Sequence, residues 1–286
     1  MPYYKRVVII GSGRLPKNCI NALLQYNLEL ICIEPVETKF PVLSKFCKSI
    51  DIDYIKILDK NELDKYFLSI TEITLVVSAY NIHIFSPKVL LNCNILIVNF
   101  HNSLLPKHRG RNSPTWAIFE MDDVAGISWH LITDKIDKGN LIKQNSFKIP
   151  EKINALELSQ LCLDAGSKCF NEIVFSLITN DFKSKEVKNP TNNIVHHSKE
   201  MPNNGLFDAS WSINKGFAFL RSLDYFIYPI FPKPVILISG KKFKIIDYKY
   251  FRNDDISNEY AFHECQNYLS FNNDDSYLRL YLNENE

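Results

Sequence analysis

Short runs of β-branched and other apolar residues recur through the first third of the chain, separated by segments with helical periodicity. Runs of this length and composition are typical of buried strands, which we expect over residues 5–10, 28–34, 52–58, 73–79 and 94–100. Helix-like segments follow the first four, over residues 15–27, 41–50, 61–70 and 86–92. This alternation predicts an α/β fold with a doubly wound, mostly parallel, Rossmann-like sheet.

The pattern then changes to longer elements. A helix is expected over 115–121, strands over 124–132 and 141–147, and a long helix with a broad apolar stripe over 155–178. From residue 179 to about 204 the chain is rich in Asn, Lys, Ser and Pro, which indicates a linker. We therefore predict a first domain of residues 1–180 and a smaller C-terminal α+β region of residues 181–286.

The C-terminal region has weaker patterns. A short helix over 210–224 is expected to begin with Ser210 or Ser212 as its N-cap. Residues 235–251 have the pattern of a hairpin that turns at Gly240 and Lys241. The last thirty or so residues, rich in Asn and Asp, allow no assignment.

Composition narrows the class of protein. With 286 residues, 46% of them hydrophobic, the chain can bury a sizeable core, and its 33 basic and 32 acidic residues nearly cancel. This balance gives no overall attraction to nucleic acid or to an anionic membrane. The first apolar run has only four residues, too short for a signal peptide. Seven scattered cysteines without a CxxC pair indicate neither a disulfide framework nor a metal site, so we expect a cytoplasmic protein without a membrane partner.

Three polar residues stand where ligands bind in such sheets, beyond the carboxyl ends of the strands. Asn99 and His101 end the fifth expected strand, and Asp137 follows in a later loop. An amide that donates a hydrogen bond stabilises an oxyanion as it forms. An imidazole can move a proton near neutral pH, and a carboxylate beside it raises its pKa. Without further evidence, a polar pair at a strand end is more often a loop-capping feature than a catalytic site.

The sequence motifs around these residues favour a catalytic site over a loop cap. The motif NxHxSLLP at 99–106, a His-containing strand and DxIDxGxLI at 134–142 resemble the 10-formyltetrahydrofolate-dependent formyltransferases. That family includes glycinamide ribonucleotide transformylase, methionyl-tRNA formyltransferase and sugar N-formyltransferases. The likeness is good over roughly residues 75 to 145. It implies that Asn99, His101 and Asp137 form the reacting centre and that 10-formyltetrahydrofolate donates the formyl group.

The resemblance also implies where the folate binds. Residues 78–87 correspond to a stretch whose backbone helps to bind the pterin, and the loop that leads to Asp137 is expected to contribute further contacts. The predicted folate-binding residues are Tyr80, Asn81, Ile82, His83, Ile132, Thr133 and Lys135. A lone histidine such as His83 is more often a core or surface residue than a ligand contact.

Other residues are assigned to the amine substrate. Ser12 and Gly13 follow the first strand, in a turn that faces the amine substrate in the family; a nicotinamide site is not favoured, because Pro16 replaces the third glycine of GxGxxG. Ser103 either shapes its loop or contacts the ligand. Arg109 and Arg111 either hold a phosphate or a glutamate tail, or lie in a solvated loop.

The segment 210–234 is similar to the start of the C-terminal region of sugar N-formyltransferases. By position in that family, Trp211 and Arg221 would lie near the substrate entrance. The alternative is a core tryptophan beneath the helix and an exposed arginine.

The acceptor is chosen among the substrates of the family. About a hundred residues after the first domain disfavour a purine-pathway enzyme, and a C-terminal part that is not basic disfavours transfer RNA. We therefore predict formylation of a nucleotide-linked amino sugar, in the synthesis of a surface glycan such as lipopolysaccharide. Methionyl-tRNA and an amino-acid amine remain alternative acceptors. A folate-binding protein without turnover is disfavoured by the intact Asn, His and Asp, and a homodimer is compatible with the family.

Overall fold

The computed structural model describes residues 2–36, 42–187, 194–226, 228, 230–252, 268–273 and 275–284. Cys265, part of the expected linker (188–193), the first residue of the helix expected over 41–50 and about half of the unassigned C-terminal stretch lie outside these ranges. Contacts within the chain define two units. The first comprises Met1–Gly110, Ala125–Phe147 and Gln160–Val195, and the second comprises Arg111–Val124, Lys148–Ser159 and His196–Glu286. The domain boundary near residue 180 stays a prediction.

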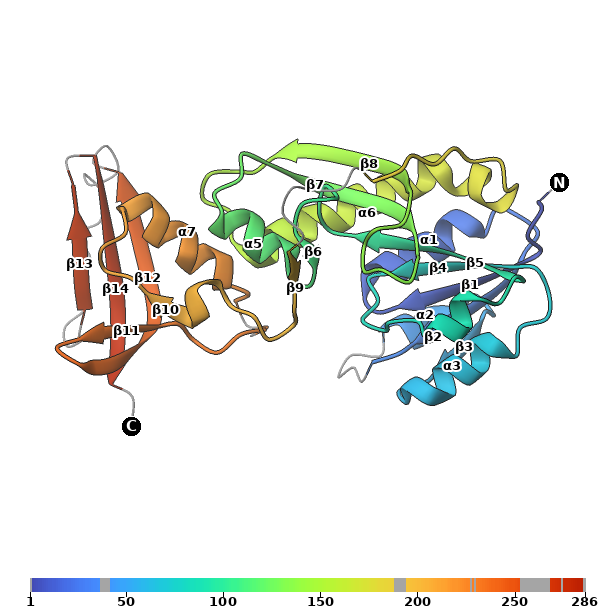
Figure 1. Cartoon of the computed structure of the whole chain (residues 1–286), viewed down its shortest axis with the longest axis horizontal. Helices are drawn as coiled ribbons and strands as arrows, with labels where there is room; N and C mark the ends of the chain where they lie inside the picture. Colours follow the sequence, from blue (N-terminus) through green and yellow to red (C-terminus); the bar gives the residue numbers. More distant parts are fainter. Residues whose placement is uncertain are drawn as a thin grey trace. The chain divides into compact units, whose positions relative to one another are not determined.

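The first unit is built on a seven-stranded sheet (Figure 1). Across the sheet the strands are β3 (Asp53–Lys56), β2 (Glu29–Glu34), β1 (Arg6–Gly11), β4 (Thr74–Ala79), β5 (Ile95–His101), β7 (Val124–Leu131) and β8 (Leu141–Lys148). The five expected early strands all form and pair in parallel, whereas β7 runs antiparallel to β5. The expected doubly wound, mostly parallel sheet is confirmed.

Helices cover both faces of this sheet. One apolar cluster joins the sheet to α1 (Arg14–Leu23), α2 (Val42–Ser49) and the long α6 (Ala155–Ile178), and a second joins it to α3 (Lys60–Leu68) and α4 (Pro87–Leu90). Successive strand residues point to opposite faces, so Val7 belongs to the first cluster and Val8 to the second. This two-sided burial explains why the strands are continuous apolar runs and lack an alternating pattern.

The predicted helix at 155–178 has the bounds observed for α6. A capping box determines its start. The Asn154 side chain accepts from the Glu157 amide at 2.9 Å, and the Glu157 carboxylate accepts from the Asn154 amide at 2.9 Å. This reciprocal pair is local in sequence, which is why the helix start was predictable.

The second unit contains a five-stranded sheet. Its order is β10 (Leu206–Phe207), β11 (Val235–Ile238), β12 (Lys241–Arg252), β14 (Ser276–Glu284) and β13 (Tyr268–Asn272). The helices α5 (Ser113–Phe119) and α7 (Ile213–Leu223), with a 3₁₀ turn (Pro202–Gly205), complete the unit. Ser212 caps α7 by accepting from Lys215 N. The hairpin forms, but its turn lies at Ser239 and Gly240, both with positive φ, so the prediction of Lys241 as a turn residue is wrong.

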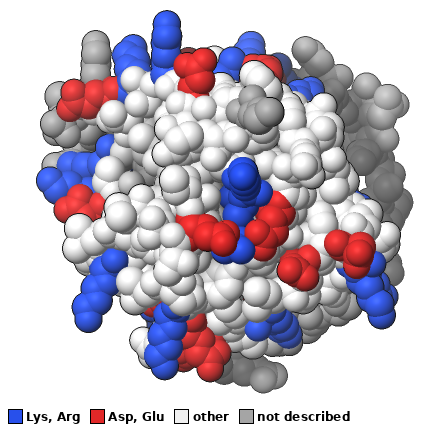
Figure 2. All heavy atoms as spheres, turned by 90° about the vertical axis from the view of Figure 1, so that its right-hand side faces the viewer, with Lys and Arg blue, Asp and Glu red and all other residues white. Residues whose placement is uncertain are grey.

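Two short strands, β6 (Arg109–Gly110) and β9 (Val195–His196), complete the elements. None of the described helices is long and apolar enough to span a bilayer. Basic and acidic side chains alternate on the face drawn in Figure 2, as the balanced charge of the sequence leads one to expect.

Close packing between α6 and β5 gives a test of the fold. A Cβ added at Gly166 would lie 2.3 Å from the Phe100 ring, and Trp129 donates its indole N–H to the Gly166 carbonyl at 3.0 Å. Helix propensity alone would make Gly166→Ala stabilising by up to about 1 kcal/mol. Because of the overlap, we expect Gly166→Ala to lower the free energy of unfolding by about 1–3 kcal/mol in urea denaturation.

The matched control is Lys168→Ala, two residues further along the same helix and exposed. Its effect should stay within about 0.5 kcal/mol. A Gly166→Ala protein as stable as the parent would contradict the packing of Phe100 against α6.

Candidate active site

A row of polar side chains crosses three neighbouring strands of the first unit. In the register of the sheet, Asn99 of β5 pairs with Ser78 of β4 and with His130 of β7. Paired residues present their side chains on the same face of a sheet, close enough to interact. The Ser78 hydroxyl donates to Asn99 Oδ1 at 2.7 Å, and Asn99 Nδ2 lies 3.1 Å from His130 Nε2. Asn99 is therefore held from both sides.

These contacts determine the orientation of the Asn99 amide. Nδ1 of His130 lies 2.7 Å from the Leu131 carbonyl oxygen, which can only accept, so Nδ1 carries the proton. In a neutral ring Nε2 then accepts, and Asn99 Nδ2 is its donor. The second hydrogen of Nδ2 has no acceptor among the described residues, and it can meet an oxygen atom of a ligand.

Asp137 lies beside this row, in the loop that follows β7. Its φ is +51°, and its carboxylate Oδ2 accepts from the Gly110 amide at 2.7 Å. Oδ2 lies 3.6 Å from His101 Nδ1, and Oδ1 lies 3.5 Å from His130 Nε2. The carboxylate is 12% exposed. A nearly buried negative charge is thus placed between two imidazoles.

His101, the last residue of β5, is positioned by its other ring nitrogen. Nε2 lies 3.0 Å from the His108 carbonyl oxygen, so Nε2 carries the proton of this contact. The basic nitrogen is then Nδ1, which faces Asp137. A proton that reaches Nδ1 is stabilised by the carboxylate, which is the arrangement a general base requires.

The two groups titrate in a way that suits this role. Burial raises the pKa of Asp137, but the nearby His101 and His130 rings and the hydrogen bond from the Gly110 amide more than offset it, so the pKa lies well below its ordinary value. Burial lowers the pKa of His101 below its ordinary value, and Asp137 offsets this only in part. At neutral pH the site therefore holds an ionised carboxylate and a neutral imidazole able to accept a proton.

Two of the predicted folate-binding residues have exposed side chains beside the row. Asn81 Nδ2 donates to Ser78 Oγ at 3.2 Å, which anchors the loop after β4 to the polar row. Tyr80 and Ile82 are 40% and 54% exposed. His83 differs, because its ring is buried and lies 3.3 Å from Asp64 of α3, and its amide and carbonyl both bond to the Asn81 side chain.

The loop after β7 holds the other three. Ile132 N donates to the Ile97 carbonyl at 3.0 Å, and the Thr133 hydroxyl donates to the Lys135 carbonyl at 3.1 Å. A Cβ at Gly139 would lie 1.7 Å from the Leu131 carbonyl oxygen. Glycine is therefore required for this loop to return to β8 as closely as it does.

Ser103 is engaged within its own loop. Its hydroxyl donates to the Lys107 carbonyl at 2.6 Å, and its carbonyl accepts from the Ser128 hydroxyl at 2.7 Å. Ser128 also accepts from Leu105 N at 3.1 Å and from Gln144 Nε2 at 2.8 Å. These bonds connect the loop after β5 to β7 and β8, so the Ser103 side chain shapes the loop in this structure.

Three substrate-binding predictions fall in the first unit besides Ser103. Ser12 and Gly13 form the turn between β1 and α1, where Gly13 has φ +77°. Gly11 before them would place a Cβ 1.8 Å from the Ala79 carbonyl oxygen, so the turn packs closely on β4. Arg109 is 2% exposed, which rules out the solvated loop that was its alternative.

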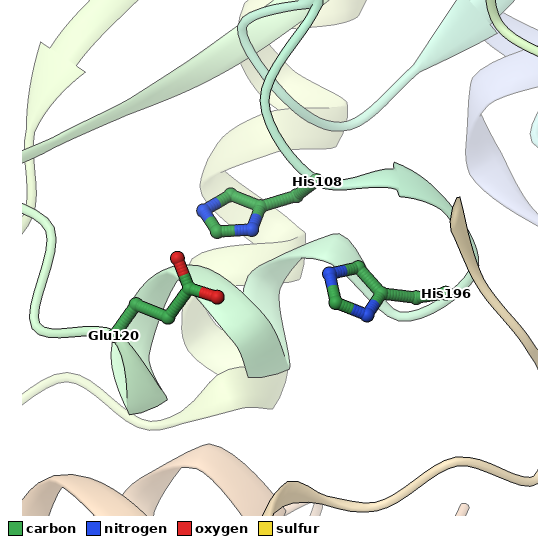
Figure 3. A group of neighbouring side chains, drawn as sticks. All are labelled: His108, Glu120 and His196. Atoms are coloured by element: carbon green, nitrogen blue, oxygen red, sulfur yellow. The ribbon is translucent and has the colours of Figure 1, made fainter. Parts of the chain in front are cut away.

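The other three lie in the second unit. Arg111 N donates to the His196 carbonyl at 2.9 Å, and Figure 3 shows the His196 ring together with Glu120 of the same unit. Trp211 packs against Phe219, with ring centroids 5.2 Å apart. Arg221 donates to the Ile153 carbonyl at 2.7 Å, so it is held by the chain and is not the exposed arginine of the alternative.

Sequence patterns alone do not single out His130, Ser78 or the Gly110 amide. His130 stands in the sequence only as part of the motif. Its contact with Asn99 depends on the antiparallel register of β5 and β7, which no local pattern reveals. The positive φ of Asp137 and its backbone donor depend in the same way on loop geometry.

Comparison with known proteins relates part of the chain to one family of enzymes. Residues 56–174 match the family model described as Formyl transferase. GDP-perosamine N-formyltransferase of Brucella melitensis is 27% identical over 148 residues, 52% of this chain and 54% of that protein. Methionyl-tRNA formyltransferase of Staphylococcus epidermidis is 32% identical over 126 residues, 44% of this chain and 40% of that protein. The chain spans about half the length or less of these relatives.

Solved structures agree on the fold. WlaRD, a sugar 3N-formyl transferase in the presence of dTDP and 5-N-formyl-THF, superposes with a TM-score of 0.72 at 21% identity and covers 98% of both chains. This likeness supports the α/β fold with a smaller second sheet described above. Over the matched segment, residues 56–174, the chain is similar to the formyl transferase family.

The electrostatics of the site predict the titration of His101. Because burial lowers its pKa, the imidazole should titrate below pH 6.5 in the native protein, followed by NMR and assigned with His101→Gln. Asp137→Asn removes the charge that raises this pKa and should lower it further. A native value at or above 6.5 would contradict the described burial.

Proposed function

We propose that the protein is an N-formyltransferase that moves the formyl group of 10-formyltetrahydrofolate to the amine of a nucleotide-linked amino sugar. The observation that supports this most directly is the joined arrangement of Asn99, His101 and Asp137 at the end of β5. The same three residue types serve as donor amide, base and carboxylate in the chemistry of formyl transfer. Their roles in this chain remain our proposal.

The reaction proceeds through a tetrahedral intermediate. The acceptor amine attacks the formyl carbon, and the carbonyl oxygen becomes an oxyanion. The second hydrogen of Asn99 Nδ2 stabilises that oxygen, with the amide already oriented by Ser78 and His130. Because no reorientation is needed when the charge develops, the donor is effective in the transition state.

Proton transfer falls to His101. The attacking nitrogen loses a proton to Nδ1, and the imidazolium that results is stabilised by Asp137 3.6 Å away. The same proton then passes to N10 of the folate as its bond to the formyl carbon breaks. The products are the formamide and tetrahydrofolate, and the imidazole returns to its neutral form.

The folate is assigned to the loop after β4 and the loop after β7. Tyr80 and Ile82 offer exposed apolar surface in the loop after β4, and the backbone of this loop carries hydrogen-bonding groups, of which the His83 amide already donates to Asn81 Oδ1 at 2.9 Å. A pterin is a flat ring with donors and acceptors on one edge, which this combination suits. Ile132, Thr133 and Lys135 would contact it from the other loop.

The acceptor is proposed from the relatives. GDP-perosamine N-formyltransferase and WlaRD are both named as sugar formyltransferases. The identity to methionyl-tRNA formyltransferase makes initiator transfer RNA the second candidate. The sequence after residue 179 contains acidic residues as often as basic ones, and a polyanionic acceptor is better served by a basic surface.

The decisive test is mass spectrometry of candidate acceptors after incubation with the purified protein and 10-formyltetrahydrofolate. The panel contains uridine-, thymidine- and guanosine-diphosphate amino sugars, and initiator methionyl-tRNA. We expect a mass gain of one formyl group on a sugar nucleotide. Formylation of the transfer RNA alone would replace this proposal by the second candidate, and formylation of neither would refute it.

Single substitutions test the assigned roles. His101→Ala should reduce kcat by about 10²–10⁴-fold, because the amine loses its base. Asn99→Ala should reduce kcat by about 10²–10³-fold through loss of the oxyanion donor. Lys168→Ala, on exposed α6 surface, is the control and should retain full activity. Full activity in either site variant would refute the corresponding role.

A further inference from the structure

A cavity lies in the first unit, on the loop that carries Asp137. It encloses about 400 Å³, and its lining includes Arg109, Lys135, Lys138, Asp134 and Glu186. Neither Asn99 nor His101 lines it. The recess therefore lies outside the three reacting residues, but Thr133 and Lys135, which are proposed above to contact the folate, also line it.

The walls of this recess are fixed by backbone hydrogen bonds. Leu131 N donates to the Asn140 carbonyl at 2.9 Å, which closes the base of the loop. Leu141 and Lys185 exchange two bonds of 2.7 Å, and this bridge holds the chain just before Glu186 against the start of β8. The recess is a built feature with anchored edges.

Its charge is positive on balance, with three cationic side chains against two carboxylates. Arg109 is 2% exposed, so its guanidinium is largely withdrawn from water. A desolvated guanidinium interacts strongly with an oxyanion and binds carboxylate or phosphate oxygens in pairs. Lys135 and Lys138 add two flexible cations, while Asp134 and Glu186 can accept from hydroxyl or amide groups of the same ligand.

From this lining we propose that the recess is a subsite for an anionic oxygen-bearing group of a substrate, a carboxylate or a phosphate. The proposal rests on the proposed function, which supplies two substrates with such groups. One is the glutamate tail of the folate, which extends as γ-linked residues that each add a carboxylate. The other is the diphosphate of the sugar nucleotide.

The recess is joined to the reacting centre through the chain itself. Arg109 directly precedes Gly110, whose amide donates to Asp137 at 2.7 Å. Lys138 directly follows Asp137. An anion bound between Arg109 and Lys138 therefore restrains both residues next to this hydrogen bond. Filling the recess would hold the Asp137 carboxylate in the position described above.

Equilibrium binding distinguishes the two sources of the anion without any turnover. By calorimetry, tetrahydrofolate with one glutamate is compared with its triglutamate, and uridine, thymidine and guanosine diphosphate are titrated separately. The variant is Lys138→Glu. Lys138 is half-buried in the lining of the recess, and the substitution reverses its charge. The control is Lys168→Glu, the same charge change on exposed α6. Thermal melting verifies that both variants fold.

We expect the triglutamate to bind roughly tenfold tighter than the monoglutamate, and this gain to vanish in Lys138→Glu but persist in Lys168→Glu. If Lys138→Glu instead weakens a nucleoside diphosphate roughly tenfold, with no effect of tail length, the subsite holds the phosphate source. Equal affinities of the two variants for every ligand would overturn the subsite. A protein that binds in this way yet formylates no sugar would refute only the proposed function.

Discussion

A buried carboxylate, that of Asp137, is the feature on which the arrangement of the site depends. Removing an ionised carboxylate from water is unfavourable unless donors and opposite charges replace the lost hydration. The Gly110 amide supplies one donor, and two imidazoles lie within 3.6 Å. The left-handed backbone at Asp137 and the glycine two residues later allow the loop to bring the carboxylate to this position.

The surrounding polar groups act mainly by holding one another. Ser78 and His130 hold Asn99, and the His108 carbonyl holds His101. Ser128 gathers three bonds that hold the loop between the two catalytic motifs. In a site whose polar groups are already oriented, little reorganisation energy is needed when a charge forms. This preorganisation is the main electrostatic advantage of an enzyme over water.

Local features of this chain were predictable, and long-range ones were not. The strands of the parallel sheet and the bounds of α6 follow from composition and from a capping box that are contiguous in sequence. The contact of Asn99 with His130 joins residues 31 positions apart and depends on strand register. Likewise, β14 falls in the stretch that allowed no assignment, although its leucines alternate with tyrosine, arginine and asparagine, and its pairing with β12 depends on residues far away in the sequence.

The burial of Trp129 has a spectroscopic consequence. Its side chain is fully buried against Phe100 and Phe170, one residue before His130, and it belongs to the first unit. The other two tryptophans, Trp116 and Trp211, belong to the second unit. With those two replaced by phenylalanine, the remaining indole emission would come from the interior beside the reacting centre alone. The fluorescence of Trp129 would then report on the first unit and not on the second.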